Sequence, residues 1–296
     1  MSKAIAAALA LLMLSVMTPP AAGAAPANAA ITDLPRDPAF PAHNQQLLIP
    51  SHGVGLNALL FVAGGKGPHP IVILMHGLPG NERNLDLAQA IRRAGWDVLT
   101  FTYRGAWGSP GDFSIANSME DTAAALAFAR SPEAAKLGID ARHIVLAGHS
   151  MGGATAAITA AGTSGLDGLI LIDAWNIAGE TSRGAKSRDE MVSGFNDFGN
   201  SLHGASPETV ADEVISKRSQ WDLVAAAAHL SRIPILTVTA RFGGAIPNRA
   251  VTSALRRAGN RRLTAIEMNT DHPFADHRIA LAKAVVGWLR SLPVKR

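Results

Sequence analysis

The stretch IVLAGHSMGGATAA, residues 144–157, changes character at its middle. Its first four residues are all apolar, as in a strand buried on both faces, and the residues from Gly152 onward are small and have helical character. Between them lies Gly148-His149-Ser150-Met151-Gly152, a turn of the form G-x-S-x-G. So tight a turn strains the backbone of the central serine and requires glycine two positions to either side. The stretch therefore predicts a buried strand, a sharp turn that exposes Ser150, and a helix.

Strands and helices alternate in both directions from this turn. Strands are expected at residues 45–49, 56–63, 71–75, 98–103, 144–147, 169–172, 235–239 and 263–268. Helices are expected at 85–94, 118–129, 152–161, 251–257 and 279–289. We expect Ser118 to cap the second of these helices, and Asp276 and His277 to lie in the first turn of the last one. This alternation is typical of an α/β protein with a mostly parallel sheet and helices on both faces.

Residues 175–230 interrupt the alternation. This stretch is polar, rich in Ser, Asp and Arg, and longer than an ordinary loop. We predict a helical lid inserted between two strands, with helical character at 212–218 and 223–230; the alternative is a disordered surface insertion. Its large apolar residues would either line a pocket or form the core of the lid itself; they are Trp175, Met191, Phe195, Phe198 and Trp221.

The start of the chain differs from the rest. Lys3 is followed by an apolar run at residues 5–17 and then by a Pro-, Ala- and Gly-rich exit. This pattern is typical of a secretory signal, and the run is shorter than the roughly 20 residues of a membrane span. Ala27-Asn28-Ala29 forms an A-x-A cleavage site, with Ala22-Gly23-Ala24 as a second choice. We therefore predict a signal peptide at 1–29 and a mature domain at 30–296, periplasmic or secreted and without stable membrane insertion after processing. The alternative is an uncleaved anchor.

Composition excludes several classes of protein. The chain of 296 residues is 48% hydrophobic and 17% charged, which suits a domain with a large core. It contains no cysteine, so disulfides, thiolate chemistry and lipoprotein anchoring are excluded. The formal net charge of +4 is spread along the chain, which does not indicate a nucleic-acid partner. No H-E-x-x-H motif occurs, and no metal site is predicted.

Two further motifs lie where strands are expected to end. Residues 75–80 read MHGLPG and follow the strand at 71–75, and residues 270–274 read TDHPF and follow the last strand. Together with the G-x-S-x-G turn, these motifs resemble the α/β-hydrolase superfamily, in its serine esterase and serine peptidase branch, over nearly all of the mature chain. The chain order of serine before histidine agrees with that resemblance.

The resemblance implies a role for each motif. Ser150 would be the nucleophile and His272 the base that takes its proton. The backbone N–H groups of Leu78 and Met151 would form the oxyanion hole, and His76 would hold the loop by hydrogen bonds. Arg104, after the strand at 98–103, would organise the loops. No cofactor is implied.

The acid of the triad is less plainly marked. The superfamily usually places it in the loop after the strand at 235–239, but residues 240–247 here read ARFGGAIP and contain no Asp or Glu. Asp173, at the end of the preceding strand, is the best substitute, and Glu267 is a weaker candidate. Asp271 adjoins the base, so its side chain should point away. A Ser–His dyad assisted by water is the remaining possibility.

The function expected from these residues is that of an exported serine hydrolase. It would cleave carboxylic esters through an acyl-enzyme intermediate, with a small apolar ester as its partner. One alternative is a serine peptidase of the same fold, similar to an aminopeptidase and acting on a peptide substrate. The other is a non-catalytic binding protein with a hydrolase-like fold, which the missing acid in residues 240–247 would explain.

Overall fold

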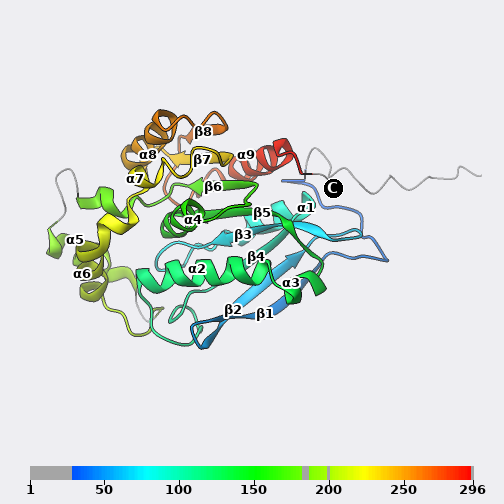
Figure 1. Cartoon of the computed structure of the whole chain (residues 1–296), viewed down its shortest axis with the longest axis horizontal. Helices are drawn as coiled ribbons and strands as arrows, with labels where there is room; N and C mark the ends of the chain where they lie inside the picture. Colours follow the sequence, from blue (N-terminus) through cyan, green and yellow to red (C-terminus); the bar gives the residue numbers. More distant parts are fainter. Residues whose placement is uncertain (1–28, 182–186, 199–200, 295–296) are drawn as a thin grey trace, which may run out of the picture.

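The computed structural model describes residues 29–181, 187–198 and 201–294. The predicted signal peptide at 1–29 lies outside these residues except for Ala29. Within them, an eight-stranded sheet has the order β1-β2-β4-β3-β5-β6-β7-β8 (Figure 1). β2 pairs antiparallel with both β1 and β4, and the pairs from β4 through β3 to β8 are all parallel. The α/β fold with a mostly parallel sheet is confirmed.

The strands agree with the predicted apolar runs to within a few residues. They are β1 His43–Ser51, β2 Val54–Val62, β3 His69–Met75, β4 Asp97–Phe101, β5 Ile139–His149, β6 Gly168–Ile172, β7 Ile235–Ala240 and β8 Leu263–Met268. β4 and β6 are buried at every residue, whereas every residue of β8 is partly buried or exposed because it is an edge strand. The G-x-S-x-G turn follows β5, which lies in the interior of the sheet between β3 and β6.

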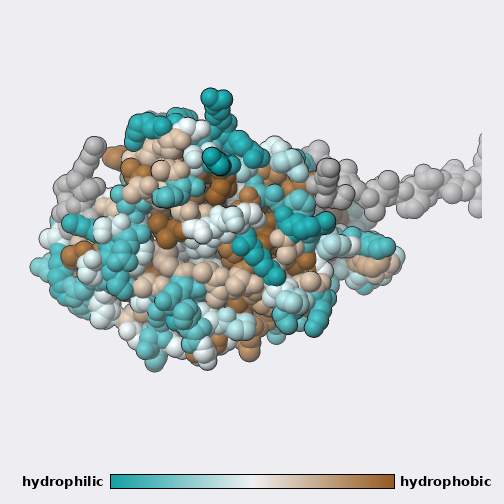
Figure 2. Space-filling model, viewed as in Figure 1, coloured by the Kyte–Doolittle hydropathy of each residue, from teal (hydrophilic) through white to brown (hydrophobic). Residues whose placement is uncertain are grey.

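Helices cover both faces of the sheet. Those of the sheet core are α1 Leu85–Arg93, α2 Ile115–Ala129, α3 Pro132–Lys136, α4 Met151–Ala161, α8 Ala245–Arg257 and α9 Arg278–Ser291. α2, α4 and α8 pack on one face with Ile73 and Leu146, and α1 and α9 pack on the other with Val72 and Val145. The alternation along each strand explains why the central strands are apolar at every position. Figure 1 shows α2 crossing in front of the sheet, and Figure 2 shows the same face with hydrophilic and apolar residues mixed.

Three predictions about where helices start are wrong: the cap at Ser118, the first-turn placement of Asp276 and His277, and the start of the helix predicted at 251–257, which begins at Ala245 as α8. α2 begins at Ile115, because Ser114 caps it by accepting a hydrogen bond from the Asn117 N–H at 2.9 Å. Ser118, the predicted cap, is instead buried inside the helix, and its hydroxyl donates to the Ile115 carbonyl at 2.6 Å. α9 begins at Arg278, so Asp276 and His277 precede the helix and do not form its first turn.

The insertion between β6 and β7 is helical in its described residues. It contains η1 Ile177–Thr181, α5 Arg188–Gly194, η2 Asn196–Phe198, α6 Pro207–Lys217, η3 Arg218–Trp221 and α7 Leu223–Ala226. The Glu213 carboxylate on α6 accepts from the Ile115 N–H at 2.8 Å and the Ala116 N–H at 3.1 Å, at the start of α2. An isolated bridge joins Leu202 to Ala106. These contacts join the insertion to the start of α2 and to the loop between β4 and α2. Among the described residues, no helix is both long enough and apolar enough to cross a membrane.

Candidate active site

Ser150 lies in a strained turn between β5 and α4. Its φ of 54° and ψ of −121° lie outside the regions that a serine normally occupies. The flanking glycines are required by space, because a Cβ on Gly148 would lie 2.0 Å from the Gly152 carbonyl oxygen, and one on Gly152 would lie 2.4 Å from the Met75 carbonyl oxygen. The Ser150 N–H donates to the Ile172 carbonyl at 3.0 Å, which ties the turn to the end of β6. The predicted turn is therefore present with the geometry that its sequence requires.

The turn at residues 76–80 lies against Ser150. A Cβ on Gly77 would be 2.9 Å from the Ser150 Cβ, so only glycine permits this approach. Within the described part of the chain, the N–H groups of Leu78 and Met151 have no hydrogen-bond acceptor. Met151 is also the first residue of α4, where the helix dipole favours negative charge. The arrangement can hold an oxyanion.

Asp173 and His272 are in direct contact. Asp173 Oδ2 lies 2.6 Å from His272 Nδ1, with the carboxylate fully buried and the imidazole 43% exposed. Since the carboxylate can only accept, His272 Nδ1 carries the proton and its Nε2 is left as a base. This pair joins the end of β6 to the loop that follows β8.

A loop of small residues encloses the carboxylate of Asp173. Oδ2 also accepts from the Gly244 N–H at 2.8 Å, and Oδ1 accepts from the Ala240 N–H at 3.1 Å and from Asn248 Nδ2 at 3.2 Å. A Cβ on Gly243 would lie 2.3 Å from Oδ2. The loop after β7, where the superfamily usually places the acid, therefore binds the carboxylate of Asp173 and supplies none of its own.

The other carboxylates considered as the acid lie elsewhere. Glu267 is exposed on β8 and forms an ion pair with Arg249 at 2.7 Å. Asp271 accepts from the Ala275 N–H at 2.8 Å, and Asp276 contacts Thr270 and His277. In the described residues, only Asp173 among these carboxylates contacts the His272 ring.

His149 is a residue of the site that the sequence did not single out. Its Nε2 donates to the His272 carbonyl at 2.9 Å, and the two rings lie 4.5 Å apart between centroids. Burial, and secondarily the nearby His272, lowers the pKa of His149 to about 4, so it is neutral near neutral pH. It therefore positions the loop of the base without competing for the proton. The signal was its place beside Ser150 in the G-x-S-x-G turn.

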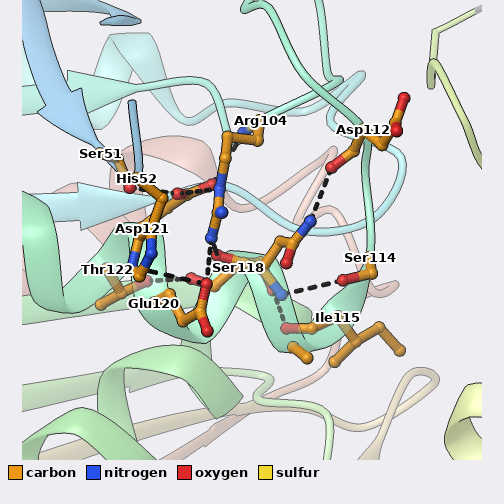
Figure 3. Close-up of polar contacts among 12 residues, drawn as sticks. Ser51, His52, Arg104, Asp112, Ser114, Ile115, Ser118, Glu120, Asp121 and Thr122 are labelled. Carbon is orange, nitrogen blue, oxygen red and sulfur yellow. Dashed lines mark hydrogen bonds and ion pairs between the residues drawn. The ribbon is translucent and has the colours of Figure 1, made fainter. Parts of the chain in front are cut away.

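Arg104 connects β4 to α2 through a buried network (Figure 3). Its Nε donates to Asp121 Oδ1 at 2.7 Å and its backbone N–H donates to Asp121 Oδ2 at 2.8 Å. The Ser51 hydroxyl also donates to Asp121 Oδ1, at 2.6 Å, and a second guanidinium nitrogen contacts Glu120. The group touches no candidate catalytic side chain. It joins the end of β1, the loop after β4, and α2.

The apolar residues of the insertion divide into two sets. Met191, Phe198 and Trp221 are buried. They belong to the hydrophobic core on the α2, α4 and α8 face of the sheet, which continues into the insertion. Trp175 and Phe195 are half-buried and meet edge to face at 6.1 Å. Trp175 follows the end of β6, and its N–H donates to the Ser150 carbonyl at 2.9 Å. Trp175 and Phe195 are therefore the partly exposed members of the group, and Phe198 lines a cleft together with Asn81 and Trp107.

No group of three or more His, Asp or Glu side chains in residues 29–181, 187–198 and 201–294 is arranged to hold a metal ion. The groups at the site are instead a hydroxyl, an imidazole, a carboxylate and two free N–H groups. This set suits nucleophilic acyl transfer, in which each of these groups has a defined task.

The chain is similar to known proteins in sequence pattern and in fold. The sequence profile of the alpha/beta hydrolase family matches residues 72–288. A search of curated protein sequences finds no match. Among solved structures, the 2,6-dihydroxy-pseudo-oxynicotine hydrolase superposes with a TM-score of 0.63 at 17% identity, covering 86% of this chain and 69% of that one.

Two esterase structures are also similar in fold. The hyperthermophilic esterase from the archaeon Pyrobaculum calidifontis has a TM-score of 0.63 at 20% identity, covering 85% of this chain and 84% of its own. The thermostable carboxylesterase EstE1, cloned from a metagenomic library, has a TM-score of 0.59 at 21% identity, covering 88% and 91%. The superpositions establish a shared fold, and at identities this low they establish the fold alone.

Proposed function

Because this chain belongs to the alpha/beta hydrolase family, we propose that it is an exported serine hydrolase that cleaves carboxylic esters through an acyl-enzyme intermediate. The observation that carries the proposal is the 2.6 Å contact between Asp173 and His272, which leaves Nε2 of the histidine free to accept a proton. The esterases among the structural relatives support an ester as the substrate class.

In the proposed first step, Ser150 Oγ attacks the ester carbonyl carbon while His272 Nε2 takes the hydroxyl proton. The carbonyl oxygen becomes an oxyanion and accepts hydrogen bonds from the Leu78 and Met151 N–H groups. Removal of one such donor typically costs about 3–4 kcal/mol of barrier. The proton then passes from His272 to the departing alcohol, which leaves an acyl group on Ser150.

In the second step, His272 takes a proton from water, and the resulting hydroxide attacks the acyl carbon. Ser150 leaves with the proton and the carboxylic acid is released. The buried carboxylate of Asp173 stabilises the imidazolium that forms in each step. His149 positions the loop of the base because it donates to the His272 carbonyl. No cofactor takes part in these steps.

The test is turnover of p-nitrophenyl acetate and butyrate by the wild-type chain and by Ser150→Ala. We expect turnover by the wild type and its loss in the variant. Turnover retained by the pure variant would remove Ser150 as the nucleophile. A fluorophosphonate probe should label the wild type but not Ser150→Ala. If the chain were a binding protein without catalytic activity, the probe would label neither the wild type nor the variant. Aminoacyl p-nitroanilides decide between the two bonds, since faster cleavage of these amides would favour a peptidase.

Export is supported by the charged start, the apolar run at 5–17 and the Ala27-Asn28-Ala29 site. The experiment is N-terminal sequencing of the protein recovered from the periplasmic and culture fractions of a Gram-negative expression host. A mature chain that starts at Ala30 is expected. Recovery of only the full-length chain in the membrane fraction would instead indicate an anchor.

A further inference from the structure

A groove separate from the candidate active site lies over β1, β2 and β4, beside the start of α1. It has a volume of about 590 Å³, within the range of small-molecule sites, and Ser150, Asp173 and His272 do not line it. Three large apolar side chains that are exposed in the described chain line it: Leu48 at 66%, Leu85 at 40% and Trp107 at 38%. Leu59 and Leu74 also line it, together with the uncharged polar residues Gln46, Asn57, Thr100 and Thr102. Apolar side chains gathered in this way mark a surface that binds a partly apolar molecule.

Arg83 is the one permanently charged residue that lines the groove. Its guanidinium carbon lies 5.2 Å from the centre of the Trp107 ring, in a cation–π contact. The carboxylates nearest in sequence, Glu82 and Asp86, both pair with Arg278 instead. Within the described residues no carboxylate pairs with Arg83, so this half-buried cation is available to an anion.

His76 forms the inner wall and adds no charge. It is 3% exposed, and burial lowers its pKa to about 4, with Arg83 acting in the same direction. Its Nδ1 donates to the Gly77 carbonyl at 2.7 Å, which leaves Nε2 as an acceptor with no partner among the described atoms. The groove therefore offers one cation, a mixed lining of apolar and uncharged polar side chains, and no carboxylate.

We propose that this groove binds an amphiphilic carboxylate, a molecule with one carboxylate and an apolar body of a few to about ten carbons. The carboxylate would pair with Arg83, whose fork of N–H donors matches its two oxygens. The apolar body would cover Leu48, Leu59 and Leu85. Binding of this ligand does not depend on hydrolysis at Ser150.

Two of the side chains that line the groove, Trp107 and His76, also hold the turn at residues 76–80 by hydrogen bonds. Trp107 Nε1 donates to the Pro79 carbonyl at 2.7 Å, and His76 Nδ1 donates to the Gly77 carbonyl. A carboxylate paired with Arg83 would lie beside the Trp107 ring, on which Arg83 is stacked, and so bear on the position of the turn that carries the Leu78 N–H. If the proposed function holds, the acid released by hydrolysis belongs to the class of molecule that fits here. This coupling, unlike the binding itself, rests on the proposed function.

The test is isothermal titration of the full chain with octanoate and with octanol. Arg83→Gln should weaken octanoate binding about ten-fold or more and change octanol binding less than about two-fold, because only the carboxylate loses its partner. Leu48→Gln should weaken both ligands, since it removes apolar contact at an exposed position. Arg256→Gln, which changes an exposed arginine at the end of α8, is the matched control and should change neither.

Two results would overturn the proposal. One is equal octanoate affinity in the wild type and Arg83→Gln, with both proteins showing the same thermal unfolding. The other is loss of octanoate binding after a fluorophosphonate has blocked Ser150, which would place the ligand in the catalytic cleft. Binding that persists in Ser150→Ala and still depends on Arg83 supports the proposal even if no ester is hydrolysed. The two proposals therefore fail separately.

Discussion

Replacing Asp173 by asparagine tests the least expected part of the site. The carboxylate accepts four hydrogen bonds: His272 Nδ1 and the Gly244 N–H at Oδ2, and the Ala240 N–H and Asn248 Nδ2 at Oδ1. An asparagine side chain has one acceptor oxygen and one NH2 group. Whichever way it turns, the NH2 group faces a pair of donors in a buried site.

Each orientation of the asparagine amide lowers either kcat or the free energy of unfolding. If the NH2 group faces His272, the histidine must carry its proton on Nε2 and cannot take one from Ser150, which in a Ser-His-Asp triad lowers kcat about 10⁴-fold. If it faces Ala240 and Asn248, two hydrogen bonds to a charged acceptor are lost, each contributing about 1.5–3 kcal/mol. We expect kcat to fall by about three to four orders of magnitude and the free energy of unfolding to fall by about 3 kcal/mol.

The assay is steady-state hydrolysis of p-nitrophenyl butyrate near neutral pH, together with urea unfolding of the same preparations. Glu267→Gln is the control, because it removes an exposed ion pair with Arg249 and should leave kcat within about two-fold. A folded Asp173→Asn protein that keeps more than a tenth of the wild-type kcat would refute the role of Asp173. The four contacts would then be structural only.

Three further predictions concern the fold that carries the site. Gly152→Ala should yield no folded protein, because its Cβ would meet the Met75 carbonyl at 2.4 Å, whereas Gly287→Ala on α9, with nothing within 4 Å, should keep or raise the melting temperature. Arg104→Ala should lower the free energy of unfolding by about 3–5 kcal/mol in urea, since it leaves the Asp121 carboxylate buried without its partner; a change below about 1 kcal/mol would contradict this. Burial raises the pKa of Asp97 to about 7. Its folded pKa lies above the unfolded value, so its stabilising contribution is complete in acid and is lost as pH rises from about 4 to 7. Asp97→Asn should therefore raise the melting temperature at pH 8 and change it little at pH 4, which calorimetry at the two pH values would measure.

The sequence predicts the fold well where apolar runs are continuous. Each predicted strand from 71–75 to 235–239 overlaps an observed strand, because a strand buried on both faces leaves a continuous apolar run in the sequence. Boundaries are less well predicted. Ser118 and Ser114 are both acceptable caps by residue type, and the choice depends on packing of Ile115 into the core, which is not local information. α3 at Pro132–Lys136 is too short to produce a periodic pattern.

The site divides in the same way. The G-x-S-x-G turn marks Ser150 because the close approach of Gly148 to Gly152 lies within five consecutive residues, although Gly152 also approaches the distant Met75 carbonyl. The contact between Asp173 and His272 joins residues 99 positions apart, so no pattern near either residue predicts it. A trace did exist in the loop after β7, where Gly243 and Gly244 stand in place of a carboxylate. Glycine is required at residue 243 because the Asp173 carboxylate fills the space that a side chain there would occupy.

The acid of this site follows β6, whereas the superfamily usually places it after β7, and this difference leads to a final prediction. β6 and β7 are adjacent parallel strands, so their carboxyl ends lie at one edge of the sheet, and an acid after either strand can approach His272. A Cβ on Gly243 would lie 2.3 Å from Asp173 Oδ2 and 3.0 Å from the His272 Cα, which places a residue-243 side chain in the space of the present carboxylate. Asp173 has a φ of 40°, which glycine adopts readily, so Asp173→Gly empties that space with little backbone strain.

Adding Gly243→Asp to Asp173→Gly should then return the acid to the loop after β7. We expect the double variant to hydrolyse p-nitrophenyl butyrate about ten-fold or more faster than Asp173→Gly alone. Full recovery is not expected, since the tight approach to the His272 Cα must relax and the Ala240 and Asn248 donors are aimed at the old site. Asp173→Gly with Gly243→Asn has the same shape without the charge and is the control. Equal activity of the two double variants would show that a carboxylate at 243 does not orient His272, and that adjacency of strand ends is insufficient for exchanging the acid.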